Sequence, residues 1–144
     1  MTSDPNAPPR IIVHTPAHAQ AALAAARAAD RSVILQSPPR CALIQGAAWF
    51  RTLIEAARAQ VPDADALAVL DCGDAPGLAL TALRDGAEAV RLEAADPARA
   101  AVADIADQLG VRLDEGPAAP VLDLLDARDP AEACRRFFSS GLEV

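Results

Sequence analysis

Residues 67–92 read LAVLDCGDAPGLALTALRDGAEAVRL, and this stretch decides the fold class. The apolar run 67–70 predicts a buried strand, which ends in Asp71-Cys72-Gly73-Asp74. Asp74 is expected to cap a helix from Pro76 to Asp85, and Gly86 to close that helix in the left-handed conformation. Residues 89–92 predict the next strand. A strand, a helix and a strand in this order indicate a parallel, right-handed crossover.

The same alternation precedes this stretch. Residues 10–14 predict a strand, and Thr15-Pro16 predicts the start of an alanine-rich helix that ends near Ala29. Residues 33–35 predict a second strand, and a helix is expected from about Gly46 to Gln60. Its apolar stripes are expected to pack inward, with residues Trp49, Phe50, Leu53, Ile54 and Ala57.

The alternation also continues after residue 92. Asp96-Pro97 predicts a helix that ends at Gly110, and residues 111–113 predict a fifth strand. The tail is expected to be helical over 121–125 and again from Asp129-Pro130 onward. The sequence therefore predicts about five parallel strands alternating with helices, as a part-TIM-barrel or a flavodoxin-like three-layer sandwich.

Composition excludes several classes of protein. A chain of 144 residues fits one domain, which is predicted to span residues 10–138. Residues 1–9 are predicted to be a disordered lead-in, and residues 139–144 are interpreted as the remnant of an expression tag. A net charge of -7 argues against a nucleic-acid partner, and no apolar run is long enough to span a membrane. Three widely spaced cysteines favour reduced thiols in the cytoplasm, and the absence of lysine excludes Schiff-base chemistry.

Polar residues follow every predicted strand. Ligands of parallel α/β sheets bind outside the carboxyl ends of the strands, so these residues are candidates for a shared site. Each is equally explained by the polarity of loops. The strand ends are His14-Thr15, Gln36-Ser37, Asp71-Cys72, Glu93 and Asp114-Glu115.

Several of these segments carry a family resemblance: Ile12-Val13-His14, Val33 to Ser37, Ile44-Gln45-Gly46, Leu70-Asp71-Cys72-Gly73, Leu83 to Val90, and Leu113 to Gly116. From Ile11 to about Gly116 the chain resembles the class II, metal-dependent fructose-bisphosphate and tagatose-bisphosphate aldolases, which are TIM barrels. The resemblance implies that Asp71 is the acid or base and that Cys72 replaces a zinc-binding histidine. The later strands, which carry that family's other histidines and phosphate loops, have no counterpart here.

The candidate site residues follow from these observations. Asp71 and His14 are the candidate catalytic residues, and zinc or magnesium is a possible cofactor. Cys72 is expected to have its pKa lowered by the helix that follows it, or else to be a small core residue. Asp71 is equally explained as a helix cap, and His14 by hydrogen bonds within its loop. The remaining candidates are Gln36, Ser37 and Glu93 for substrate, and Cys72 with Glu115 for a metal.

Three hypotheses for function follow. The first is an aldolase-like, non-catalytic domain with a binding or assembly role, dimerising through an open sheet edge or its apolar C-terminal helix. The second is a metal-dependent lyase that uses Asp71 on a small-molecule ligand. The third, a receiver-like signalling domain, ranks last because the chain has no lysine and its first strand ends in His14-Thr15 rather than in an acidic pair.

Overall fold

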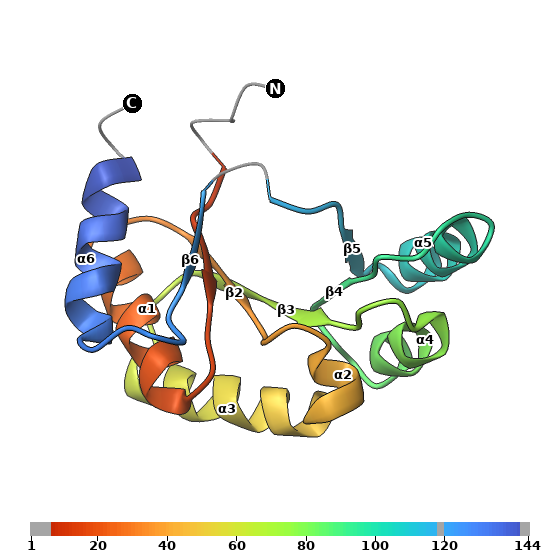
Figure 1. Cartoon of the computed structure of the whole chain (residues 1–144), viewed down its shortest axis with the longest axis horizontal. Helices are drawn as coiled ribbons and strands as arrows, with labels where there is room; N and C mark the ends of the chain where they lie inside the picture. The colour runs from red at the N-terminus through yellow and green to blue at the C-terminus, as the bar shows by residue number, and fades with distance from the viewer. Residues whose placement is uncertain (1–6, 118–119, 142–144) are drawn as a thin grey trace. The chain divides into compact units, whose positions relative to one another are not determined.

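The strands and helices of the chain alternate in an α/β fold (Figure 1). The computed structural model describes residues 7–117 and 120–141. Over those residues it contains six strands and six helices, one strand more than expected. Their bounds are β1 (Arg10–Ile12), α1 (Pro16–Ala28), β2 (Val33–Gln36), α2 (Cys41–Ile44), α3 (Ala47–Gln60), β3 (Ala66–Asp71), α4 (Pro76–Arg84), β4 (Ala89–Arg91), α5 (Ala98–Leu109), β5 (Arg112–Asp114), β6 (Val121–Asp123) and α6 (Pro130–Gly141).

The chain is organised as two compact units, and the division falls within α3 and within β3. The first unit comprises the described parts of Met1–Gln36, Leu53–Leu67 and Pro117–Val144. The second unit comprises Ser37–Thr52 and Ala68–Gly116. Each unit combines parallel strands with helices, whereas the single domain over 10–138 stays a prediction.

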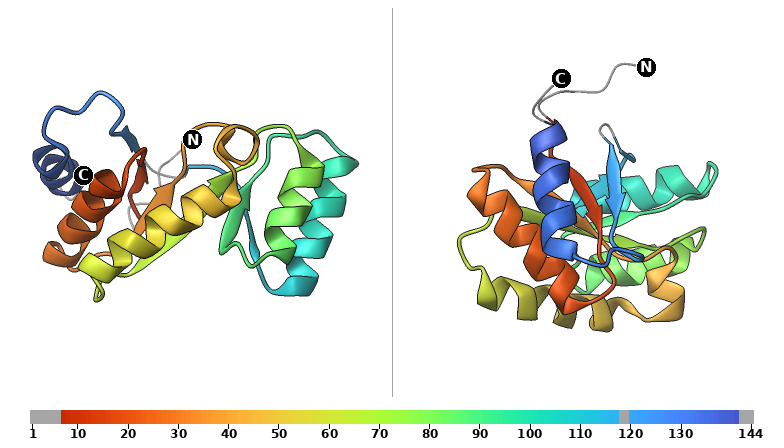
Figure 2. Two further views of the ribbon diagram at one scale, coloured as in Figure 1. Left: turned by 90° about the horizontal axis from the view of Figure 1, so that it is seen from below. Right: turned by 60° about the vertical axis from the view of Figure 1, so that its left-hand side comes forward.

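The first unit has β1 as its central strand. β1 pairs in parallel with β2 on one side and with β6 on the other. The helices α1 and α6 pack against each other and lie side by side in both views of Figure 2. The buried face of α1 is mainly alanine, and such small side chains let a neighbouring helix approach closely. As predicted, Thr15 begins this helix: its Oγ1 accepts the backbone N–H of His18 at 3.0 Å.

The second unit has β4 as its central strand. β4 pairs in parallel with β3 and β5, and α4 and α5 pack against each other (Figure 2). Val69, Val90 and Leu92 are fully buried, so the apolar runs that predicted these strands do form the core. Gly86 closes α4 at φ +94°, as predicted for a left-handed helix end.

Two local predictions are wrong. Residues 121–123 form a strand, not the start of a helix, because they pair with β1, which lies more than 100 residues earlier in the sequence. A short apolar run such as Val-Leu does not distinguish strand from helix without that partner. Asp74 does not cap α4: Ala75 occupies the cap position without a side-chain hydrogen bond, and Asp74 Oδ1 lies 3.9 Å from Arg40 Nη2.

The short helix α2 was not expected from the sequence. It lies between Arg40, at φ +58°, and Gly46, at φ +96°. A left-handed conformation at a non-glycine residue is strained, so Arg40 must be held in it by its surroundings. Cys41, the first residue of α2, is buried.

Both ends of the chain include residues that the structure describes. In the lead-in, the Pro9 carbonyl accepts the N–H of Ile34 at 2.9 Å, whereas residues 1–6 lie outside the described part. Ser139 to Gly141 continue α6, and the rest of the interpreted tag remnant also lies outside the described part. Of the helices in 7–117 and 120–141, none combines the length and the apolar character that crossing a bilayer requires.

Candidate functional site

A single arginine joins the carboxyl ends of the three strands in the second unit. Arg91, at the end of β4, lies 3.1 Å from Glu93 (Nη2 to Oε1) and 3.5 Å from Asp114 (Nη1 to Oδ2). Its Nε lies 4.0 Å from Oδ2 of Asp71. The side chains of Asp71 and Asp114 are only 12% and 7% exposed, so their charges need a cation nearby. These four residues form the arginine cluster.

Asp71 is bound by the backbone as well as by the arginine. Its Oδ1 accepts the N–H of Gly73 at 2.8 Å and that of Arg40 at 3.2 Å. Gly73 has φ +56°, and a Cβ at this position would lie 3.1 Å from Cγ of Arg40, so a larger residue would be strained and would require Arg40 to shift. Asp71 therefore fixes the turn after β3 and the backbone that precedes α2.

Ser37 belongs to the same network. Its Oγ accepts the backbone N–H of Asp71 at 2.8 Å and donates to the Pro38 carbonyl at 3.3 Å. Ser37 is fully buried. The hydroxyl predicted to bind substrate is therefore used to join the segment after β2 to the end of β3.

Cys72 faces the core rather than the site. It is fully buried, and burial raises the pKa of its thiol to about 12, with the charge of Asp71 adding to the effect. The expectation that the helix N-terminus lowers this pKa is wrong, because loss of hydration outweighs the helix dipole. Burial likewise raises the pKa values of Cys41 and Cys134 to about 11.

We expect the thiols of the folded protein to be nearly unreactive. With pKa values of about 11 to 12, roughly one thiol in a thousand or fewer is ionised at pH 8. Dithionitrobenzoate should release little colour from the native protein and three equivalents after unfolding in guanidinium. Because the folded pKa values are raised, the unfolded thiols ionise first, and stability should fall as the pH rises above about 9. Rapid native labelling would contradict this burial.

Glu93, predicted to bind substrate, and Glu115, predicted to bind a metal, are exposed and paired with arginines. Glu93 contacts Arg91, and Glu115 Oε2 lies 3.1 Å from Arg99 Nη2. Arg99 also donates to the carbonyl of Leu92. Within residues 7–117 and 120–141, no three His, Cys, Asp or Glu side chains gather so that they could hold a metal ion. Cys72 and Glu115, the two predicted metal ligands, therefore do not belong to such a group in this part of the chain.

A histidine and a carboxylate meet at the carboxyl ends of β1 and β6 in the first unit. His14 Nε2 lies 2.7 Å from Oδ1 of Asp123, and the same oxygen accepts the N–H of Leu125 at 2.9 Å. Because an ionised carboxylate can only accept, the proton of this contact belongs to His14. A histidine oriented by a carboxylate is suited to proton transfer, and it equally fastens β6 to the end of β1.

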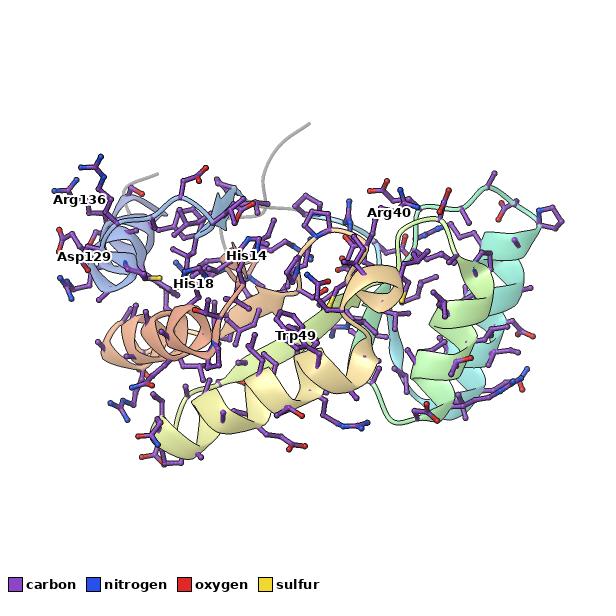
Figure 3. All side chains as sticks on the ribbon, turned by 60° about the horizontal axis from the view of Figure 1, so that its bottom comes forward. His14, His18, Arg40, Trp49, Asp129 and Arg136 are labelled. Atoms are coloured by element: carbon purple, nitrogen blue, oxygen red, sulfur yellow. The ribbon has the colours of Figure 1, made fainter. Side chains whose placement is uncertain are left out.

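His18 lies beside this pair. Its Nδ1 accepts the backbone N–H of His14 at 3.1 Å, and the two rings meet edge to face with centroids 5.9 Å apart (Figure 3). Burial and the neighbouring His14 lower the pKa of His18, while the charge of Asp123 opposes them. His18 is half-buried, and its ring is hydrogen-bonded to the backbone.

Gln36 has a different neighbour from the other candidates. Its Oε1 accepts a hydrogen bond from Nη1 of Arg10 at 2.7 Å, and both side chains are buried in the first unit. Asp71, Ser37 and Glu93 are joined through the arginine cluster in the second unit. That all the strand ends meet on one edge stays a prediction.

Two residues that organise these contacts were missed in the sequence. Arg91 is the one charged residue in an otherwise apolar strand, and that position alone signals a buried ion pair. Asp123 was missed because its segment is predicted to be a helix, so it was not considered as a strand-end residue. Comparison with models of known protein families gives no match, and no curated protein matches the sequence.

Proposed function

We propose that this chain is a non-catalytic, aldolase-like α/β module with an assembly role, and that it acts as a homodimer. The Asp71 carboxylate supports this proposal most strongly, because both of its oxygens already contact other groups of the same chain. One oxygen accepts two backbone N–H groups, and the other lies near Arg91. A carboxylate held in this way is a structural group.

A catalytic base must offer a lone pair to a substrate proton at hydrogen-bond distance. Asp71 instead stabilises the turn at Gly73 and the backbone of Arg40, and its neighbour Cys72 is buried with a raised pKa. The metal-dependent lyase therefore has less support than an assembly role. The aldolase-like character itself rests on the resemblance of the sequence.

Exposed apolar side chains favour a protein partner. Several large apolar residues of the described chain are more than one third exposed, although the chain is acidic. Exposed apolar groups that gather on a surface mark interaction sites. An assembly role accounts for them, whereas a small-molecule enzyme does not require them.

The assembly role is tested by the mass of the protein in solution. Light scattering during size-exclusion chromatography should give about twice 14.9 kDa, with the monomer appearing on dilution. A monomer that persists at several hundred micromolar would contradict the proposal. The measurement should be made in reducing buffer, because the three cysteines are free and a disulfide-linked pair would mimic the result.

One observation favours a second candidate, a small-molecule enzyme. The His14–Asp123 pair lies at the carboxyl ends of two neighbouring parallel strands, where ligands of α/β proteins bind. In that version the acid or base would be His14 rather than Asp71. The pair ranks second because its contact also serves to fasten β6, and because no third residue completes a metal site among the described residues.

A further inference from the structure

We propose that His14, His18 and Asp123 form a pH-sensitive joint between β1, α1 and β6, and that this joint opens when His18 takes up a proton. The histidine joint lies in the first unit, where β1 ends and α1 begins. It concerns the response of the fold to pH, so it goes beyond the proposed assembly role and does not depend on it.

The hydrogen bonds of the histidine joint determine which ring nitrogens carry protons. His14 Nε2 lies 2.7 Å from Oδ1 of Asp123, and because an ionised carboxylate can only accept, this nitrogen carries the proton. His18 Nδ1 accepts the backbone N–H of His14 at 3.1 Å, so it must be unprotonated. An imidazole that is protonated on both nitrogens cannot make this second contact. The closed joint therefore requires a neutral His18.

Protonation of His18 would break the contact between α1 and the end of β1. A proton on Nδ1 would face the backbone N–H of His14, so that two donors meet and neither has an acceptor. A backbone N–H that loses its acceptor in a partly buried position is costly. His14 is therefore expected to move away from the first turn of α1 when His18 becomes charged.

Asp123 would transmit this movement to β6. Its Oδ1 accepts from the His14 ring and, at 2.9 Å, from the N–H of Leu125, which follows β6. β6 has three residues and pairs with β1. Segments held by so few contacts open locally at a low cost in free energy. The end of β6 is therefore expected to loosen together with the turn at His14.

The other charged groups near α1 are engaged elsewhere. The ionisable side chains of α6, which packs on α1, are Glu132, Cys134, Arg135 and Arg136. Glu132 pairs with both arginines, and the buried thiol is neutral. Asp129 and Arg136 point away from the two histidines in Figure 3. β2 contains no ionisable side chain, and Arg10 of β1 binds a side chain of β2. The groups that face His18 are therefore its two partners in the joint.

The direction of the pH response follows from the surroundings of His18. Burial and the neighbouring His14 lower the pKa of His18, while the charge of Asp123 opposes them. A histidine released from the joint has an ordinary pKa of about 6.5, so the open joint binds the proton more readily than the closed one. The stabilisation from the joint is therefore complete above about pH 6.5 and is lost as the pH falls through the lower pKa of the closed joint.

Hydrogen exchange of the His14 backbone N–H tests the joint in the full chain. Its protection factor is the exchange rate of an unstructured peptide divided by the measured rate, which removes the intrinsic effect of pH. Between about pH 7.5 and about pH 5 this factor should fall by roughly threefold or more. The Leu125 N–H should lose protection in parallel. Protection of the His14 N–H that stays constant over this range overturns the proposal.

His18→Asn is the matched control. Asparagine offers an acceptor oxygen near the position of Nδ1 but takes up no proton in this pH range. The protection factor of the His14 N–H should therefore change by less than about twofold between the same two pH values. A variant that loses protection as the wild type does would show that another group is the trigger, and the proposal would be wrong.

The tautomers of the wild-type histidines give a readout that needs no variant. The chain contains two histidines, so nitrogen NMR distinguishes both rings. At about pH 7.5 the proton of the neutral His18 ring should reside on Nε2, as the contact with the His14 N–H requires. A proton on Nδ1 of His18 at this pH contradicts the joint.

Discussion

Arg91→Met is expected to lower the free energy of unfolding by about 3 kcal/mol. The substitution keeps most of the side-chain volume but removes the cation shared by Asp71, Glu93 and Asp114. Two of these carboxylates are almost fully buried, and a buried charge that loses its partner costs more than the pair contributed. Urea denaturation followed by circular dichroism measures the change.

Two further variants make the Arg91 result specific. Arg91→Lys should lower the free energy of unfolding by less than Arg91→Met, because it keeps the positive charge. It should still be less stable than the wild type, because lysine cannot contact several carboxylates with a planar group. Arg135→Met removes an exposed pair with Glu132, one turn apart on α6, and should leave the free energy of unfolding nearly unchanged. If Arg91→Met were no worse than Arg135→Met, the arginine cluster would not hold the strand ends together.

The fold was predictable where its signals are local. The runs before Asp71 and before Arg91 are apolar enough to identify buried strands, and Thr15 and Gly86 mark helix ends by their own chemistry. β6 was not predictable, because its three residues become a strand only through pairing with β1. The number of strands was therefore underestimated by one.

The candidate site was predictable only in part, for a related physical reason. The sequence identified Asp71, Ser37 and Glu93 as strand-end residues, and the second unit joins them. It did not indicate that their partners are an arginine and backbone N–H groups, because these contacts come from separate strands and turns. The depth of Cys72, which reverses the expected direction of its pKa shift, is likewise set by packing rather than by its neighbours in sequence.

Asp71→Ala is expected to lower the free energy of unfolding by about 2 to 3 kcal/mol. It leaves the N–H groups of Gly73 and Arg40 without their acceptor and removes one partner of Arg91. Because the Arg40 N–H contact fixes the backbone that enters α2, its loss should also loosen that short helix. Urea denaturation followed by circular dichroism measures the change in stability.

Asp71→Asn distinguishes a positioning role from a catalytic one. Asparagine keeps an oxygen that can accept both backbone N–H groups, so it should retain most of the stability. If Asp71 were a catalytic base, asparagine would reduce the activity as strongly as alanine, because an amide cannot take up a proton. If Asp71→Asn lowered the stability as much as Asp71→Ala, the charge of the carboxylate would matter more than the two backbone hydrogen bonds. The expected order, with asparagine close to wild type, follows from the two backbone hydrogen bonds that Asp71 accepts.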